Sequence, residues 1–463
     1  MSTTKIKWII CILIILGNFL GMLDSSSVNL ALYQIAESLN ITLSQVQWVV
    51  IAYMLVLTVF LPFFGKLGDI LPKNKLYGYG FLIFALGALL NSTSSNLYTL
   101  LTYRCIEALG ASVMMANGPS TIATLFKGEQ RGKALGINGC LVAVGGLLGP
   151  AIGGLLINAF GWRTVFLPGV PIALIASIAS FKLLPSYKTQ KFDFKFDYKG
   201  FIYFTIGLFA LLLAISQGHQ WGWKSLQIIS LGIITLIFGA LFYLRDRKIN
   251  YPLINFDMFK IKTFTFGNIA VMMAYMCMFT NAILLPFYLQ EILKFNAFIT
   301  GLLILPYAIA SSTIAPFAGG YSGKHGSHIL TKIGPCIYIL ALLIFITFNK
   351  TTPIWLIITA SFLMGVGNGL FQSPSNNAII TSVPKDELGV ASGILALSRN
   401  LGNILGVAIT ITLFDHFKTH LLSNGIIYET AFLSAFHKTM YFGICFGTIC
   451  LICASIAYNK QLK

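Results

Sequence analysis

Three ionisable residues in otherwise apolar stretches are the best candidates for chemistry in this sequence. Asp24 lies in the apolar segment that begins near Trp8, and Arg104 and Glu107 lie in the one that begins near Leu97. Charged side chains inside such segments are costly to bury, and they mark functional sites by default. Glu107 follows Arg104 by three residues, so the two side chains share one face of a helix.

This combination of groups is suited to moving protons. At a rise of 1.5 Å per residue, Asp24 and Arg104 both lie roughly 10 Å below the outer ends of their segments. Burial favours the neutral carboxyl group, whereas a nearby guanidinium favours the carboxylate. We therefore expect Asp24 and Glu107 to carry protons and Arg104 to bias them. The alternative is a static ion pair that only fixes the register of the helices.

The elements that position these groups are membrane spans. The chain of 463 residues is 56% hydrophobic and 10% charged, with a mean hydropathy of +0.81, whereas soluble proteins carry about 25% charged residues. Windows of about 20 apolar residues predict fourteen transmembrane helices in an all-α integral membrane protein. The predicted spans begin near Trp8, Trp48, Leu76, Leu97, Ala134, Thr164, Gly200, Leu226, Phe264, Thr300, Ile333, Ile354, Ala391 and Met440.

The formal charge of +17 is explained by the orientation of the chain in the membrane and does not indicate a nucleic-acid interface. About 23 of the 31 Lys and Arg residues fall on one side of the predicted topology, which the positive-inside rule makes cytoplasmic. We expect a multi-pass protein of the plasma membrane with both termini in the cytoplasm, a monomer whose partners are the lipid bilayer, protons and a small molecule. The eight cysteines lie in apolar segments, and the sequence contains no Walker motif or metal-ligand cluster. No cofactor or metal is therefore expected, and a proton gradient would supply the energy.

An internal repeat divides the chain into two halves. Pro62–Asp69 (PFFGKLGD) resembles Pro316–Gly323 (PFAGGYSG) at an offset of 254, and Gly149–Ile152 (GPAI) resembles Gly406–Ile409 (GVAI) at 257. Parallel six-helix repeats are a transporter architecture with substrate sites between the halves. We predict a six-helix bundle at 1–190, an inserted two-helix hairpin with flanking loops at 191–262, and a second six-helix bundle at 263–463.

Two glycine-containing segments are expected to move. The loop after the second span (GKLGDILPKNK) contains Gly65, Asp69 and Lys73. Asp69 could bind free N–H groups of a neighbouring helix and latch a cytoplasmic gate, and only one half can carry that latch because its counterpart is Gly323. The fifth span contains a small-residue seam that we expect to face the second half, formed by Gly145, Gly149, Pro150, Gly153 and Gly154.

Polar and Met-rich positions in other spans are candidates for a substrate cavity, because such residues either join helices or line wet space. The candidates are Asn29, Tyr53, Asn117, Tyr275, Met276, Asn281, Gln372 and Asn376.

These motifs resemble the major facilitator superfamily, in particular its fourteen-span drug:proton antiporter branch (QacA/EmrB-type multidrug exporters). LDSSSVNLAL at 23–32 resembles the first-span motif of that branch, whose acid falls on Asp24. GLLGPAIGG, entered from Gly145, matches the antiporter motif, and RCIEALGA at 104–111 resembles the fourth-span motif with Glu107 in place of glutamine. The loop motif is kept at Asp69 but has Ile70 in place of its basic residue and Pro72 in place of its glycine.

The resemblance implies the major facilitator fold and a proton-coupled antiporter that exports lipophilic or cationic drugs by alternating access. This activity is associated with multidrug efflux and antibiotic resistance. Uniport, symport, or export of a lipid or metabolite on the same fold are alternatives. A membrane-embedded enzyme or sensor is a further one, for which the segment 415–437 offers Asp415, His416, His420 and Glu429.

Overall fold

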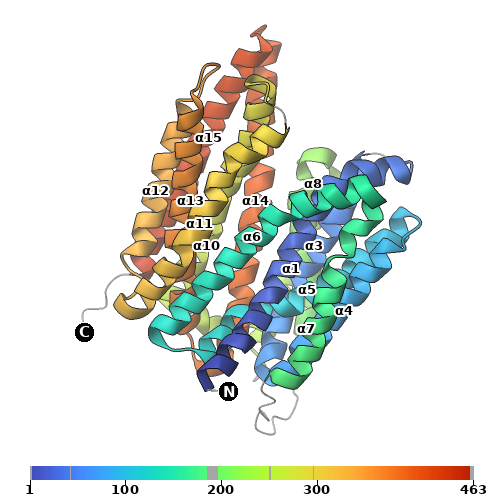
Figure 1. Cartoon of the computed structure of the whole chain (residues 1–463), viewed down its shortest axis with the longest axis vertical. Helices are drawn as coiled ribbons and strands as arrows, with labels where there is room; N and C mark the ends of the chain where they lie inside the picture. Colours follow the sequence, from blue (N-terminus) through green and yellow to red (C-terminus); the bar gives the residue numbers. More distant parts are fainter. Residues whose placement is uncertain (1–2, 42, 185–196, 250–251, 296, 459–463) are drawn as a thin grey trace.

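The computed structural model describes residues 3–41, 43–184, 197–249, 252–295 and 297–458. The described chain is helical, and long α-helices run roughly along one direction of the molecule (Figure 1). The boundary predicted between residues 190 and 191 lies outside the described residues, so it stays a prediction.

The α-helices are α1 (Thr3–Ser38), α2 (Leu43–Val46), α3 (Trp48–Ile70), α4 (Lys73–Ser92), α5 (Leu97–Leu125), α6 (Gly128–Phe160), α7 (Gly169–Leu183), α8 (Tyr198–Trp221), α9 (Leu226–Asp246), α10 (Lys262–Phe287), α11 (Ala297–His325), α12 (Leu330–Ile346), α13 (Ile354–Thr381), α14 (Leu388–Ser423) and α15 (Tyr428–Ala457). Short 3₁₀ turns lie at η1 (Trp162–Phe166), η2 (Phe256–Lys260) and η4 (Lys385–Glu387), and a π-helical segment, η3 (Tyr288–Ile292), follows α10.

Local sequence explains several helix boundaries. Asn96 caps α5, because its side chain accepts from Thr99 N while the Thr99 hydroxyl accepts from Asn96 N. Ser225 caps α9 in the same way by accepting from Ile228 N. At the far end of α6, Gly161 has φ +86°, a conformation that favours glycine, and the chain turns there into η1.

Ten of the helices are long and apolar enough to cross a membrane, and the shorter α12 is also apolar. The protein is therefore an all-helical, multi-pass membrane protein. Each of the fourteen predicted spans begins within or next to one helix of fifteen or more residues. The helices α4, α5 and α6 lie outside that group of ten, so the fourteen-span count stays a prediction.

Two helical bundles carry separate cores. One large cluster of buried apolar residues is built mainly from α1 to α7 and another mainly from α10 to α15. In Figure 1 the two bundles stand side by side, with α6 and α14 in the region between them. Both ends of the described chain lie toward the lower end of that view, which we call the terminal end.

Helix packing repeats between the bundles as the sequence repeat predicts. Within the first bundle, α6 packs against α1, with Gly145 close to Phe19; within the second, α14 packs against α10, with Gly402 close to Met272. Across the bundles, α6 packs against α11 and α14 packs against α3. The offset of 254 residues relates α3 to α11, and the offset of 257 residues relates α6 to α14. The contact of α6 with α11 therefore corresponds to the contact of α14 with α3.

The helices between the two bundles differ in their contacts. The helix α8 packs against α9 and also touches α3 and α14, so it contacts both bundles. By contrast, α9 packs mainly against α8, and many of its large apolar side chains, such as Leu236, are exposed. This exposure is what a lipid-facing helix requires.

Candidate functional site

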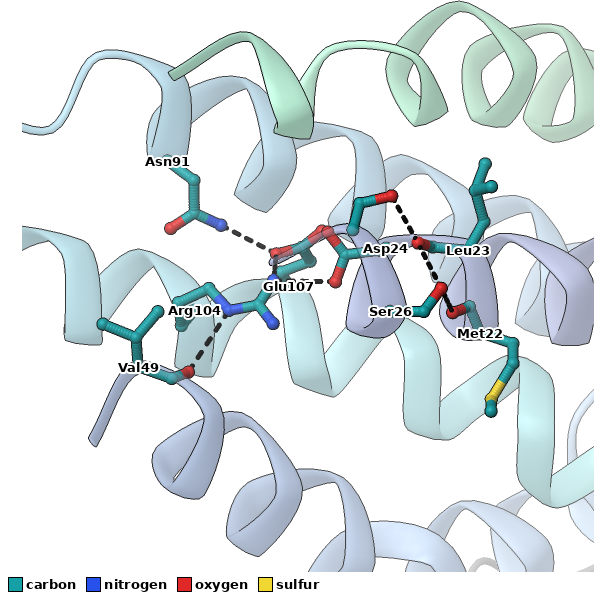
Figure 2. Close-up of polar contacts among 9 residues, drawn as sticks. Met22, Leu23, Asp24, Ser26, Val49, Asn91, Arg104 and Glu107 are labelled. Atoms are coloured by element: carbon teal, nitrogen blue, oxygen red, sulfur yellow. Dashed lines mark hydrogen bonds and ion pairs between the residues drawn. The ribbon is translucent and has the colours of Figure 1, made fainter. Parts of the chain in front are cut away.

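Asp24, Arg104 and Glu107 meet in one buried cluster inside the first bundle. The Arg104 guanidinium donates from the same nitrogen, Nη1, to Asp24 Oδ2 at 2.7 Å and to Glu107 Oε2 at 2.6 Å (Figure 2). Arg104 is 1% exposed and Glu107 is fully buried. Asp24 of α1 and Arg104 of α5 were predicted to lie at the same depth in their spans, and the two side chains are in contact. Arg104 and Glu107 also pair along one face of α5, as their spacing predicts.

Neighbouring helices hold the guanidinium in place. Arg104 Nε donates to the Val49 carbonyl of α3 at 3.4 Å. The guanidinium also lies 4.2 Å from the centre of the Tyr53 ring and 5.6 Å from that of Phe166, so cation–π attraction adds to the ion pairs. Asn91 of α4 donates from Nδ2 to Glu107 Oε2 at 2.7 Å. Four helices and η1 thus converge on one cation.

The charges in this cluster do not balance when both acids are ionised. Two carboxylates and one guanidinium carry a net charge of −1, and buried net charge is strongly unfavourable. Binding one proton to either carboxyl group makes the cluster neutral. The arrangement is therefore chemically able to take up and release a proton, which is the behaviour expected of carboxyl groups that share a site.

Asp24 has little access to open space in this structure. It is 7% exposed and borders a cavity of only about 10 Å³. The cavity is lined by residues of the first bundle alone, including Phe84, Ile152 and Gly169. In this conformation the cluster is closed off, because α4, α6, α7 and η1 surround the cavity.

Asp69 connects the two bundles at the terminal end. Its Oδ1 accepts from Gly389 N at 2.7 Å and its Oδ2 accepts from Val390 N at 3.1 Å. These N–H groups lie in the first turn of α14, where no intrahelical acceptor exists and the helix dipole favours an anion. The sequence analysis expected this type of contact for Asp69, whereas its action as a gate latch stays a prediction.

The residues beside Asp69 have different roles. A Cβ on Gly65 would lie 2.4 Å from the Gly389 carbonyl oxygen, so α3 and α14 approach each other closely only because both residues are glycine. Lys73 Nζ donates to Asn117 Oδ1 at 3.2 Å, which links α4 and α5 within the first bundle. Gly323 occupies the position in the second half that corresponds to Asp69. A Cβ there would lie 2.4 Å from the Gly128 carbonyl oxygen, so no acidic side chain fits and the second half cannot build the same latch.

The glycine seam between the bundles is formed by other glycines than those predicted. A Cβ on Gly149 would lie 1.9 Å from Ser26 Oγ, and one on Gly153 would lie 3.3 Å from Ser27. Gly145 and Gly154 also face α1, and the side chain of Pro150 lies outside the described part of the structure. The antiporter-like motif therefore packs within the first bundle, and the expectation that it faces the second half is wrong.

Closer to the terminal end, α6 does meet the second bundle through glycine. A Cβ on Gly132 would lie 1.8 Å from the Gly319 carbonyl oxygen, and one on Gly136 would lie 2.4 Å from that of Ala315. The interpretation failed because a glycine run shows that helices pack closely but does not show which neighbour they pack against.

Tyr275 and Gln372 are the predicted cavity residues that the structure brings together. Gln372 Nε2 donates to the Tyr275 hydroxyl oxygen at 2.5 Å. A Cβ on Gly139 of α6 would lie 3.4 Å from Gln372 Oε1, so this polar group faces the first bundle.

The other predicted cavity residues lie elsewhere. Tyr53 packs on Arg104, and Asn117 is buried and donates to the Phe64 carbonyl at 2.9 Å. Asn29 is exposed on α1, and Met276 is buried where α14 approaches at Gly406. The remaining two, Asn281 and Asn376, are buried with Oδ1 atoms that have no hydrogen-bond partner.

Three polar contacts were missed by the sequence reasoning. Asn91 binds Glu107, Asn18 Nδ2 donates to Asn138 Oδ1 at 2.7 Å, and Arg131 Nε donates to Asn377 Oδ1 at 2.9 Å across the bundles. No sequence signal separates Asn91 from the other asparagines in apolar segments. Among the described residues, no group of three or more His, Cys, Asp or Glu side chains is arranged to hold a metal ion.

Comparison with known proteins identifies the family. The family model described as Major Facilitator Superfamily matches residues 14–407. The chain belongs to the major facilitator superfamily. It is also similar to solved members of this fold, including a proton:xylose symporter, XylE (TM-score 0.65, 16% identity, 97% of this chain and 95% of that chain). The human organic anion transporter MFSD10 gives TM-score 0.65 at 12% identity, with 96% and 99% covered.

Curated major facilitator relatives cover most of the chain. The "Riboflavin transporter RibZ" of Clostridioides difficile (strain 630) is 36% identical over 423 residues, which is 90% of this chain and 91% of that protein. The "Multidrug transporter protein MdtP" of Bacillus subtilis (strain 168) is 28% identical, with 89% and 76% covered. The "Multidrug resistance protein Stp" of Mycobacterium tuberculosis (strain ATCC 25618 / H37Rv) is 27% identical, with 85% and 73% covered.

As a major facilitator protein, the chain is a transporter of small molecules rather than an enzyme. Of the residues that an enzyme would have used, Asp415, His416 and His420 lie on one face of α14, and Glu429 lies on α15. Asp415 pairs with Lys418 at 3.3 Å and Glu429 pairs with Lys350 of another segment. His416 and His420 line only a shallow hollow of about 480 Å³ along one face of α14.

Proposed function

We propose that this protein is a proton-coupled antiporter that exports an aromatic small molecule across the plasma membrane by alternating access. The observation that carries the proposal is the buried cluster in which one Arg104 nitrogen binds the carboxyl groups of both Asp24 and Glu107. A transporter that exchanges protons needs a group that can be neutral in one state and charged in another. This cluster supplies such a group at the junction of four helices.

We propose fourteen spans, cytoplasmic termini and a monomeric carrier energised by the proton gradient without a cofactor. With that orientation, the terminal end faces the cytoplasm. The contacts of Asp69 with α14 and of Gly132 with Gly319 then close the cytoplasmic side. Release of the Asp69 contact would open that side, and the two bundles would exchange access by separating at these glycines.

Two substrate classes remain under this proposal, and each has its own support. Drug-like solutes are supported by the relatives named as multidrug transporters. A flavin-like metabolite is supported by the 36% identity with a protein named as a riboflavin transporter. The hydrogen bond between Gln372 and Tyr275 supports the second class, because uncharged polar groups that face the first bundle suit a neutral aromatic metabolite.

Transport in proteoliposomes separates these possibilities. Purified protein is reconstituted, a pH gradient is imposed, and movement of riboflavin and of ethidium is measured in parallel. We expect the gradient to drive accumulation of one of these probes. Gln372→Leu, which removes the hydrogen bond to Tyr275, should reduce riboflavin transport more than ethidium transport. Movement of both probes at equal rates with and without the gradient would contradict proton coupling.

A further inference from the structure

Asn91 is a fully buried amide that the proposed mechanism has not yet used. Its Nδ2 donates to Glu107 Oε2 at 2.7 Å, and its side chain is 0% exposed (Figure 2). The backbone fixes this pairing. A Cβ on Gly87, one turn before Asn91, would lie 2.5 Å from Glu107 N, so α4 and α5 are in direct contact at this level. Asn91 is therefore held over the Glu107 carboxyl group.

Each partner of this hydrogen bond also has a buried oxygen atom that makes no hydrogen bond. Asn91 Oδ1 and Glu107 Oε1 have no hydrogen-bond partner. An unpaired buried polar atom costs free energy, and native structures usually avoid it. The Asn91 oxygen is therefore free to form a hydrogen bond with Glu107 if the amide turns.

The chemistry of the two groups defines the second state. An ionised carboxylate only accepts hydrogen bonds, whereas a protonated carboxyl group also donates one. Arg104 has donors only, so it can bind the carboxylate but cannot accept the proton of the acid. An amide has both kinds of group. A half-turn of the Asn91 amide replaces Nδ2 by Oδ1 at the same position without losing any other hydrogen bond.

We infer that Asn91 is the positioning residue for a proton carried by Glu107. This inference rests on the proposed proton coupling. In the ionised state the amide donates from Nδ2 to Glu107 Oε2. A proton from the aqueous phase on one side then binds Oε2, and the amide turns so that Oδ1 accepts it. The proton leaves to the aqueous phase on the other side, and no other bond forms or breaks.

Other groups around Glu107 do not offer this exchange. Asp24 faces it from α1 and adds negative charge, and Arg104 faces it from α5 and adds positive charge. Tyr53 approaches from α3, but its ring lies against the guanidinium. From η1, the apolar Phe166 lies against the same guanidinium. The Asp24 carboxylate can accept the proton of a neutral Glu107, but while it is ionised it cannot donate to the Glu107 carboxylate. Among these described neighbours, Asn91 alone can bond both forms of Glu107 with no change in its own protonation.

Infrared difference spectroscopy tests this assignment on the full chain in lipid nanodiscs. Spectra at acidic and alkaline pH should differ by a C=O band of a protonated carboxyl group, and Glu107→Gln should abolish that band. A carboxyl O–H that donates a hydrogen bond has a lowered C=O frequency. Asn91→Leu, which has a similar size and no polar group, should therefore shift the band to higher frequency.

Controls separate this result from a loss of structure. Asn91→Ser also removes the contact, with a smaller change in packing, and should give the same upward shift. It serves as the test variant if Asn91→Leu does not fold. Asn18→Leu removes another buried amide contact, the 2.7 Å bond to Asn138, and should leave the band in place. A band that does not move in the folded Asn91 variants overturns the inference, as does a spectrum in which Glu107→Gln removes nothing.

The test also distinguishes this inference from the proposed function. If Glu107 gives no band while transport stays coupled to protons, the inference is wrong and another group, such as Asp24, carries the proton. If the band depends on Asn91 but no proton movement accompanies transport, the proposed antiport is wrong and the assignment of Asn91 stands.

Discussion

Removing the charge of Asp69 should shift the balance between two conformations of the transporter. The Asp69 carboxylate accepts from two first-turn N–H groups of α14, at 2.7 and 3.1 Å. Hydrogen bonds to charged groups contribute about 1.5–3 kcal/mol each, and Asn in this position keeps one acceptor oxygen. Asp69→Asn should therefore weaken the contact between the bundles by about 2 kcal/mol, since one charged hydrogen bond is lost. That loss corresponds to a roughly 25-fold change in the ratio of closed to open terminal ends.

Pulsed electron spin resonance can measure that ratio. Spin labels at Lys75 and Lys385, both exposed at the terminal end, are introduced after the native cysteines are replaced. The short-distance population should fall and a longer-distance population should rise in Asp69→Asn. Glu129→Gln is the matched control, because Glu129 is an exposed acid in the first turn of α6. An unchanged distance distribution in Asp69→Asn, or an equal change in the control, would refute the latch.

Three further experiments test other contacts. Arg104→Met leaves two buried carboxyl groups without their cation, so it should lower the free energy of unfolding by about 3–5 kcal/mol. Adding Glu107→Gln to the same chain removes one of these acids and should recover part of that loss. Thermal unfolding in detergent measures both variants, and no recovery in the double variant would contradict the charge argument. Gly319→Ala places a Cβ 2.1 Å from the Gly132 carbonyl oxygen, so the short-distance spin-label population should decrease and transport should slow. Gly149→Ala places a Cβ 1.9 Å from Ser26 Oγ inside the first bundle. It should therefore lower the thermal stability and leave the spin-label distances between the bundles unchanged. A change in those distances would show that this motif faces the second half.

The sequence was most informative where geometry follows directly from helix periodicity. Equal depth in two spans and a spacing of three residues were sufficient to bring Asp24, Arg104 and Glu107 together as candidates. The contact of Asp69 with a helix start was also expected, because an acid at a helix end among cations has few other roles. The repeat was visible because the same close approaches recur in both halves, as at Gly65 and Gly319.

Other features depend on packing that one sequence does not encode in a readable way. The Gly149 motif packs on α1 rather than on the second bundle, and a stripe of glycine gives no direction toward one neighbour. Asn91 resembles many other asparagines in spans, and only the contact between α4 and α5 at Gly87 explains its place over Glu107. The closed state of the Asp24 cavity likewise depends on residues that α4, α6, α7 and η1 bring together around α1.

We propose that the buried carboxyl pair Asp24 and Glu107 couples solute movement to protons. The most direct test loads proteoliposomes with a pH-sensitive dye and applies a gradient of the transported probe without an imposed pH gradient. The wild-type protein should move protons against the probe, whereas the folded double variant Asp24→Asn, Glu107→Gln should exchange the probe with no proton movement. Equal proton movement in the double variant would contradict the account, because the coupling would then reside outside this cluster.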